Sequence, residues 1–261
     1  MILPDRLTPE ARVARFARIC DQAMRERREQ GTDGIGTLAE KWQHQIIKRY
    51  LSEDPSDHEV RVSEERRFVS DVRVGNQAFE VQTGAFAPMK EKIAYYLEHT
   101  SLEVTVVHPI PKRKTVCWID PITQEISEPK RSPRYGRSID LLPEMYPLIP
   151  YLCNERLRFR VLLLEVRDFR LLSSNKRNRK LHAERFERIP MALCEDISFD
   201  CPEDFRALLP EELPSPFTVK QFSALTKLRG QDAYSAVRVL VALGLAAPAE
   251  KIGRSMAFEI P

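Results

Sequence analysis

Long apolar runs and a secretion signal are missing from this sequence. The longest apolar stretch, residues 239–247 with one glycine counted, is far shorter than the roughly 20 residues that a bilayer-spanning helix needs. Residues 1–30 are rich in charge where a signal peptide would be apolar. We therefore expect a cytoplasmic protein with no membrane partner.

Paired cysteines, a glycine-rich phosphate loop and a strong excess of one charge are missing as well. The five cysteines are scattered and none forms a CxxC pair, which argues against a disulfide framework and a structural zinc site. Without a phosphate loop, ATP-driven chemistry is not expected. The net charge of +3 is close to neutral, so any affinity for a polyanion has to come from local clusters of basic residues.

The composition that remains is that of a globular protein with one large and one small domain. The chain has 261 residues, of which 43% are hydrophobic and 30% charged, so it can bury a core. We place an N-terminal helical arm at residues 1–33, the large domain at 34–205 and the small domain at 206–261.

Two helices are predicted near the N-terminus. Residues 9–29 carry apolar side chains at helical spacing, and a second stripe of 3.6-residue period runs from residue 35 to residue 50. Glu40 lies on the flank of the second stripe. The first stripe comprises Val13, Phe16, Ala17, Cys20 and Met24, and the second comprises Ile35, Leu38, Ala39, Trp42, Ile46 and Tyr50.

The following residues predict an α/β fold with a mixed central sheet flanked by helices. Residues 68–74 and 77–83 alternate around Gly75 and Asn76, a pair that favours a tight turn, and so predict a β-hairpin. A helix at 88–99 follows, then strands at 102–107, 115–119 and 159–166, with a short proline-interrupted helix at 139–149. Pro109 and Pro111 are interpreted as a rigid connection between two of these strands.

The last part of the chain has the outline of a winged helix-turn-helix. Thr218 and Gln221 have the spacing of a capping box at the start of one helix, and a second helix begins near Asp232 and ends at Gly244. Residues 245–249 and 256–260 can then pair as a ribbon with a basic tip.

The hairpin register places two acids opposite each other. With a two-residue loop, Asp71 faces Glu80 on one side of the hairpin, while Val72 and Phe79 pack on the other side. Like charges so placed repel, and Mg²⁺ or Mn²⁺ would turn this repulsion into attraction. The simpler alternative is a solvated sheet face on which Arg73 partly neutralises both acids.

These acids and their element order resemble a known family. Glu40 on a helix, Asp71 in the stretch VSDV and Glu80 in FEVQ resemble the core of the PD-(D/E)xK nucleases, and residues 34–190 resemble uncharacterised bacterial proteins with this core and a C-terminal winged helix. The resemblance implies a restriction-endonuclease-like core. It also implies that Asp71, Glu80, Glu40 and the backbone carbonyl of Val81 hold Mg²⁺ or Mn²⁺ for phosphodiester hydrolysis.

Gln82 departs from the pattern of this family, in which a lysine stands at that position. A glutamine cannot supply a positive charge, although some relatives use glutamine there. Lys90, on the next helix, is a candidate substitute. The catalytic residues implied are therefore Glu40, Asp71, Glu80, Gln82 and Lys90, and weak or lost catalysis is the alternative.

Basic clusters are the predicted contacts with DNA. Residues 112–137 include seven basic and three acidic residues, and residues 176–188 include six basic and two acidic residues. Such clusters suit contacts with phosphates. The second helix of the winged helix and its basic tip add further candidates, although solvated loops or a protein-binding winged helix would use the same residue types. The predicted DNA-binding residues are Lys112, Arg113, Lys114, Lys130, Arg131, Arg134, Arg137, Lys176, Arg177, Arg179, Lys180, Arg238, Lys251 and Arg254.

Together these features predict a metal-dependent DNA endonuclease or resolvase-like hydrolase that a winged helix positions on DNA. The alternative is a non-catalytic, regulatory DNA-binding protein on a degenerate nuclease scaffold, and a protein-binding adaptor is a third possibility. Homodimer formation and a protein partner of the winged helix are left open.

Overall fold

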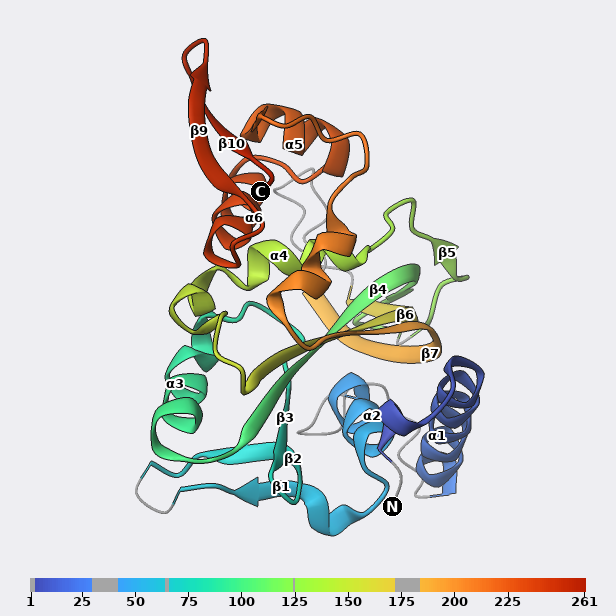
Figure 1. Ribbon diagram of the computed structural model, residues 1–261. Helices are drawn as coiled ribbons and strands as arrows, with labels where there is room; N and C mark the ends of the chain where they lie inside the picture. Colours follow the sequence, from blue (N-terminus) through green and yellow to red (C-terminus); the bar gives the residue numbers. More distant parts are fainter. Residues whose placement is uncertain (1–2, 30–41, 64–65, 124, 172–183) are drawn as a thin grey trace. The chain divides into compact units, whose positions relative to one another are not determined.

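The computed structural model describes residues 3–29, 42–63, 66–123, 125–171 and 184–261. Over these residues the chain forms a seven-stranded mixed sheet with helices packed on it, and a three-stranded antiparallel sheet at the C-terminal end (Figure 1). The predicted mixed α/β class is confirmed. None of the described helices is long and apolar enough to cross a membrane.

The chain divides into two compact units, each assembled from three segments. Unit 1 comprises Met1–Val60, Pro109–Gly136 and Leu162–Asp196, and unit 2 comprises Arg61–His108, Arg137–Val161 and Ile197–Pro261. Strands β4 (Glu103–Ile119), β6 (Leu157–Leu171) and β7 (Glu184–Phe199) contribute residues to both units. The domain boundaries predicted at residues 34 and 206 stay predictions.

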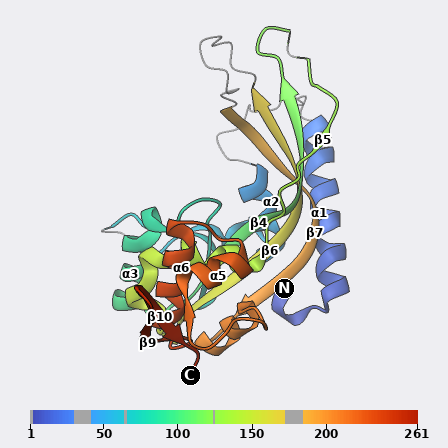
Figure 2. The same cartoon turned by 90° about the horizontal axis from the view of Figure 1, so that it is seen from above.

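The large sheet has the strand order β1-β2-β3-β4-β6-β7, and β5 pairs with β4. Figure 2 shows β4, β6 and β7 running side by side, as this order requires. Strand β7, which the sequence analysis did not predict, completes one edge of this order. The remaining strands of this sheet are β1 (His58–Arg61), β2 (Val69–Val74), β3 (Gln77–Val81) and β5 (Lys130–Arg131).

The predicted hairpin between β2 and β3 is confirmed. The two strands are antiparallel, and their register pairs Val72 with Phe79. Gly75 has a φ of 59°, a left-handed conformation that suits glycine in a two-residue turn. On its other side β3 pairs in parallel with β4, with Val81 opposite Val107.

Strand β4 is continuous where the sequence predicted two strands and a connection. Proline has no N–H group, so a strand accepts it only where no neighbouring strand needs that donor. β3 pairs with residues 103–107 of β4 and β5 pairs with residues 115–116. Pro109 and Pro111 fall between these two partners, and the interpretation of this segment as a connection is wrong.

Helices α1 (Pro9–Glu29) and α2 (Trp42–Leu51) pack side by side in unit 1 (Figure 1). The rings of Phe16 and Tyr50 meet edge to face with centroids 5.3 Å apart. The buried stripe of α1 includes Ile19, whereas Val13, which we expected in that stripe, is 41% exposed. The predicted stripe of α1 is therefore partly wrong, because the face that contacts α2 lies to one side of it. Trp42, Ile46 and Tyr50 of α2 are buried as predicted, and residues 35, 38 and 39 lie outside the described residues.

The strand ends that belong to unit 1 bury a small apolar cluster. Cys117 and Ile119 of β4 pack with Phe169 of β6 and with partly buried side chains of β6 and β7. Alternate residues point to opposite faces of a strand, so polar side chains of β4 and β6 that alternate with this cluster lie on the opposite face. Lys114 and Asp168 are two of these.

In unit 2, helix α3 (Lys90–His99) connects β3 to β4 as predicted and follows the short 3₁₀ helix η3 (Ala87–Met89). Arg156, just before β6, donates hydrogen bonds to the backbone carbonyls of Leu97, Thr100 and Leu102. These bonds satisfy carbonyls at the end of α3 that have no partner within the helix. The proline-interrupted helix consists of η4 (Ser138–Asp140), α4 (Leu141–Glu144) and η5 (Tyr146–Tyr151).

The C-terminal residues of unit 2 contain two helices and a ribbon, in the order that the sequence predicts. Thr218 accepts a hydrogen bond from the backbone N–H of Gln221 (3.3 Å), and the Gln221 side chain accepts one from the N–H of Thr218 (2.8 Å), which confirms the capping box. Phe217, Phe222 and Phe258 pack beneath them. The elements are β8 (Phe217–Thr218), α5 (Val219–Thr226), α6 (Gln231–Ala242), β9 (Ala247–Ile252) and β10 (Ser255–Glu259).

Candidate functional site

The two acids predicted to face each other lie at one end of the β2–β3 hairpin in unit 2. Glu80 of β3 is only 3% exposed, and its Oε2 forms an ion pair with Nζ of Lys92 on α3. Asp71 of β2 accepts a hydrogen bond from the backbone N–H of Val81, at 2.7 Å between N and Oδ2. The carboxylate of Asp71 therefore reaches the residue that follows Glu80, and the two acids share one site.

The charged groups of this site perturb one another's pKa values. Burial raises the pKa of Glu80 to about 7; the charge of Lys92 opposes this rise, and the charge of Asp71 adds to it. Burial and the neighbouring Glu80 also raise the pKa of Tyr96, which lies one helical turn beyond Lys92 on α3. Oε1 of Glu80 and the hydroxyl of Tyr96 are both buried, and among the described residues neither forms a hydrogen bond of ordinary geometry, although the two groups are close enough to affect each other's pKa.

Lys92 is the residue that sequence reasoning missed. The side chain of Gln82 is engaged elsewhere, because its Nε2 donates a hydrogen bond to the carbonyl of Ala85 at 2.6 Å. Lys90, the predicted substitute, begins α3 with an exposed side chain. Lys92 instead places its ammonium group on Glu80 and lies 5.9 Å from the centroid of the Tyr96 ring. The site thus brings together two acids and a lysine.

The donor set fits a divalent cation in part. Asp71 and Glu80 supply hard oxygen ligands of the kind that Mg²⁺ prefers, and a buried carboxylate oxygen without a partner is a feature that a bound cation would explain. Within the described ranges, however, no group of three or more His, Cys, Asp or Glu residues is placed to hold a metal. Glu40, the predicted third carboxylate, lies outside the described residues.

His108 of β4 is buried beside this site. Its Nδ1 lies 2.6 Å from the carbonyl oxygen of Gln82. Because a carbonyl can only accept, Nδ1 carries the proton and the neutral ring leaves Nε2 as an acceptor. Phe86 packs against the ring edge to face at 5.2 Å. The histidine therefore fixes the backbone of Gln82 at the end of β3.

The burial of His108 predicts a pH dependence of stability. Burial lowers its pKa below the ordinary 6.5, against the opposing effect of the hydrogen bond to Gln82. The unfolded chain therefore takes up a proton near pH 6.5 that the folded chain does not, so stability is retained above that pH and lost as the pH falls. Between pH 7.5 and 5.5, urea unfolding should show that the wild type loses about 1 kcal/mol more than His108→Gln. Equal losses in both proteins would contradict this assignment.

Several of the predicted DNA-binding residues are already engaged in ion pairs. In unit 1, Lys112 pairs with Glu195, and Arg113 pairs with Glu165 at 2.7 Å. Lys130, Arg131 and Arg134 are exposed, while Lys114 lies 3.9 Å from Asp168. In unit 2, Arg137 pairs with Asp140 and donates to the backbone carbonyl of Thr226 at the end of α5. Lys176, Arg177, Arg179 and Lys180 lie outside the described residues.

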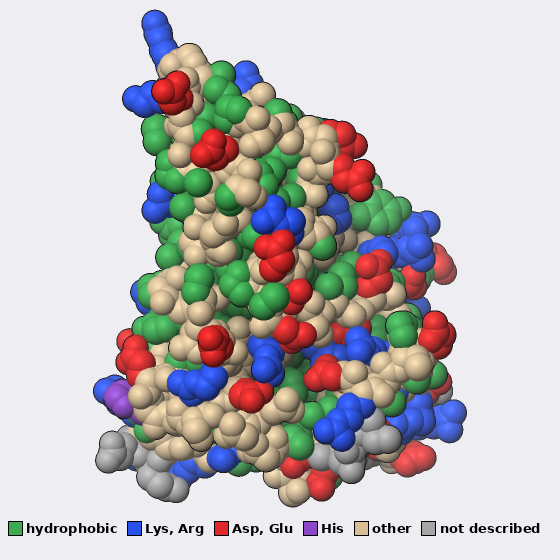
Figure 3. Space-filling model, viewed as in Figure 1, with side chains coloured by type: hydrophobic (Ala, Val, Ile, Leu, Met, Phe, Trp, Pro, Cys, Tyr) green, Lys and Arg blue, Asp and Glu red, His purple; other side chains and the backbone are tan. Residues whose placement is uncertain are grey.

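The C-terminal region that the sequence predicts to be a winged helix exposes its β9–β10 ribbon more than helix α6. Lys251 and Arg254 are exposed, and Figure 3 shows basic side chains at the tip of the β9–β10 ribbon. Helix α6 packs against α4 and η5, so its exposed strip is narrow. Tyr234 and Arg238 lie on this strip, whereas Ser235 of the same helix is only 7% exposed. Ser235 is buried because α6 is covered on more than one side.

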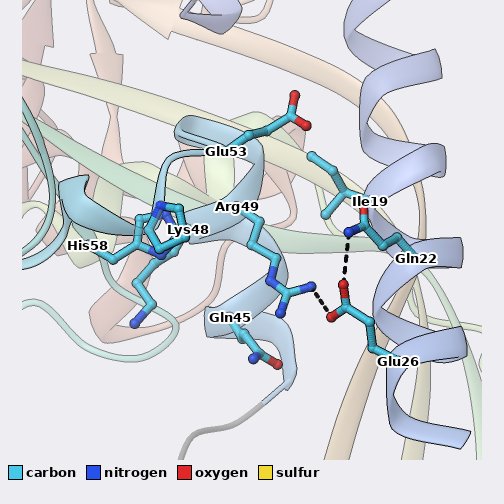
Figure 4. Close-up of a pocket in the computed structure, with 9 residues that line it drawn as sticks. Ile19, Gln22, Glu26, Gln45, Lys48, Arg49, Glu53 and His58 are labelled. Atoms are coloured by element: carbon cyan, nitrogen blue, oxygen red, sulfur yellow. Dashed lines mark hydrogen bonds and ion pairs between the residues drawn. The ribbon is translucent and has the colours of Figure 1, made fainter. Parts of the chain in front are cut away.

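A cavity of about 310 Å³ lies within unit 1, between α1, α2 and the segment that follows α2 (Figure 4). Its charged side chains are paired across the cavity: Arg49 of α2 contacts Glu26 of α1 at 2.6 Å, and Gln22 donates to the same carboxylate at 2.8 Å. Lys48 pairs with Glu59 at 2.9 Å. These pairs neutralise the charges around the cavity, and no predicted site residue lines it.

Comparison with known proteins identifies one family. A family model described as a domain of unknown function (DUF8091) matches residues 41–200, a range that contains the hairpin, α3 and the described DNA-binding candidates of unit 1, residues 112–114, 130, 131 and 134. No curated protein and no solved structure matches the chain.

Proposed function

The chain belongs to the DUF8091 family, and we propose that it is a Mg²⁺-dependent DNA endonuclease or resolvase-like phosphodiester hydrolase. The observation that carries this proposal is the convergence of Asp71, Glu80 and Lys92 at the end of the β2–β3 hairpin. Two acids on a hairpin with a lysine beside them are the charged groups of a PD-(D/E)xK site. Here the lysine comes from the following helix instead of the position of Gln82.

Each residue of this cluster has a role in the proposed reaction. Asp71 and Glu80 would hold the cation, with the carbonyl of Val81 as a further oxygen donor and Glu40 as a third carboxylate. A bound Mg²⁺ supplies Lewis-acid activation of water and of the phosphate. Lys92, whose side chain is 20% exposed, can leave Glu80 when a cation neutralises that carboxylate, and its ammonium group can then stabilise charge on the phosphate.

DNA would be bound by the basic residues that remain exposed. Lys130, Arg131 and Arg134 in unit 1 are exposed, as are Lys251 and Arg254 on the ribbon of the winged-helix region. Contacts of this kind are with phosphates and do not depend on sequence, so the affinity should fall steeply as salt is raised. The fold proposed for this function is a restriction-endonuclease-like core with a C-terminal winged helix.

Nicking of supercoiled plasmid and of branched DNA in the presence of Mg²⁺ or Mn²⁺ tests the proposal. Glu80→Gln keeps the shape of the side chain but removes a charged ligand, so we expect a loss of about 100-fold or more in the nicking rate. Glu91→Gln, on the exposed side of α3, is the matched control and should keep the wild-type rate. Equal rates for the wild type and Glu80→Gln would remove the hydrolase proposal.

A second candidate function rests on the same ion pair. Lys92 already neutralises Glu80, and the side chain of Gln82 is bonded to the backbone of Ala85, which is the arrangement expected if the scaffold binds DNA without cutting it. Salt-sensitive DNA binding with no metal-dependent nicking in the wild type would favour this regulatory function. Absence of salt-sensitive DNA binding would favour a protein-binding adaptor.

A further inference from the structure

The segment from β5 to Gly136 is held against β4 at both of its ends. β5 pairs with β4 so that Arg131 lies opposite Thr115, and the N–H of Ser132 donates to the carbonyl of Lys114 at 2.8 Å. At the other end, the N–H of Gly136 donates to the carbonyl of Pro111 at 3.0 Å. The backbone on either side of Tyr135 is therefore fixed.

Gly136 allows this close approach because it has no side chain. A Cβ atom at this position would lie 2.4 Å from Cγ2 of Ile110 and 2.6 Å from the carbonyl oxygen of Pro111. The second of these contacts is with the backbone, so a side chain at position 136 would fit only if the segment moved away from β4. The sequence at residue 136 thus keeps the preceding tyrosine in place.

Tyr135 is exposed even though its backbone is anchored. Its side chain is 54% exposed, so the ring is accessible to a ligand. The guanidinium group of Arg131 lies 5.9 Å from the centroid of its ring. Lys130 and Arg134 flank the pair and are exposed, and the sequence contains no acidic residue from 129 to 139. Figure 3 shows basic side chains over the part of the molecule where Figure 1 draws β5.

An anchored aromatic ring among cations is suited to a strand whose bases are accessible. Bases in a duplex are already stacked on each other, so their faces cannot reach a surface tyrosine, whereas the bases of a single strand can stack on it. The cations around the ring would contact the phosphates of the same strand. Because the backbone is fixed, stacking orders only the side chain, and the entropy cost is small.

We propose that Tyr135 and Arg131 form a stacking site for an unpaired base of single-stranded DNA, with Lys130 and Arg134 on the neighbouring phosphates. The choice of DNA rests on the proposed function, in which the substrate is nicked or branched DNA. The site would hold the single-stranded part of such a substrate.

Fluorescence anisotropy with a labelled oligothymidylate, in EDTA so that no cleavage occurs, tests the site. Tyr135→Ala and Tyr135→Leu should weaken binding about tenfold, whereas Tyr135→Phe, which keeps the ring, should bind like the wild type. Tyr146→Ala, which removes a tyrosine with 41% exposure in η5 of unit 2, is the matched control and should also bind like the wild type.

An oligonucleotide of abasic sites separates stacking from charge. It keeps the phosphates and lacks the bases, so Tyr135→Ala should bind it as well as the wild type does, while Arg131→Ala should bind it more weakly. The proposal would be overturned if Tyr135→Ala weakened binding of the abasic strand as much as binding of oligothymidylate. It would also be overturned if Tyr135→Ala weakened binding of duplex DNA to the same extent. Tighter binding of oligouridylate than of oligothymidylate would also overturn it, in favour of RNA.

Failure of this site and failure of the proposed hydrolase give different results. Loss of nicking in Glu80→Gln with Tyr135-dependent binding intact supports both proposals. A wild type that never nicks but shows the Tyr135 dependence removes the hydrolase and supports the stacking site. If nicking depends on Glu80 but Tyr135→Ala has no effect on binding, the hydrolase proposal is supported and the stacking site is removed.

Discussion

Replacing Lys92 with methionine is expected to reduce Mg²⁺-dependent nicking by about 100-fold or more, since it removes the positive charge beside the two acids. Methionine keeps the length and the apolar stem of lysine, so the packing of α3 against the hairpin changes little. Lys90→Met, two residues earlier and exposed, is the matched control and should nick at the wild-type rate. Initial nicking rates at saturating Mg²⁺ measure both effects.

The loss of Lys92 also leaves a buried carboxylate without its cation, so stability has to be measured with activity. Removing one partner of a buried ion pair costs about 3–5 kcal/mol, and less where a partner has access to water, as Lys92 does. Gln82→Lys added to Lys92→Met should restore part of the nicking rate, because it returns a lysine to the position that the family uses. A double variant that is stable yet inactive would contradict a purely electrostatic role for Lys92.

The acidic pair could be predicted from the sequence, but the lysine could not. Gly75 and Asn76 fix a two-residue turn, and that turn fixes which residues of the hairpin face each other. Lys90 and Lys92, by contrast, lie about 200° apart on a helix of 3.6 residues per turn. Which of them faces the hairpin depends on how α3 is rotated, and the burial of Ile93 and Leu97 sets that rotation. Tertiary packing of this kind leaves no local signal.

The long strands were predicted only in part for a related reason. Strands usually have 5–6 residues, and β4 and β7 have 17 and 16. In β4, Pro109 and Pro111 look like a break until the partners of the strand are known. In β7, Pro190 and the basic residues before it hide the alternation of apolar side chains. Whether each segment forms one long strand depends on neighbouring strands that lie far away in the sequence.

A second cluster of charged side chains lies across β4, β6 and β7. Removing the carboxylate at its centre should reduce stability more than any other substitution proposed for this protein. Asp168 of β6 is fully buried. Its carboxylate lies 2.8 Å from Nε of Arg188, 3.2 Å from Nη2 of Arg170 and 3.9 Å from Nζ of Lys114. One carboxylate therefore holds three cations from three neighbouring strands. The side chain of Arg188 is only 10% exposed, so water could not readily replace this carboxylate as its partner.

Asp168→Asn is expected to lower the free energy of unfolding by about 3 kcal/mol, because it keeps the shape of the side chain but leaves the three cations without their anion. Urea unfolding at pH 7.5 measures the change. Glu165→Gln is the control: it removes the charge that pairs with Arg113, but both of those side chains are exposed by a third or more, so it should cost less than about 1 kcal/mol. Added salt should recover part of the loss in Asp168→Asn, since it screens the repulsion among the partly exposed cations. If the two variants lost equal stability, Asp168 would not be the group that holds these strands together, and Lys114, Arg170 and Arg188 would be available to DNA as the sequence alone suggests for Lys114.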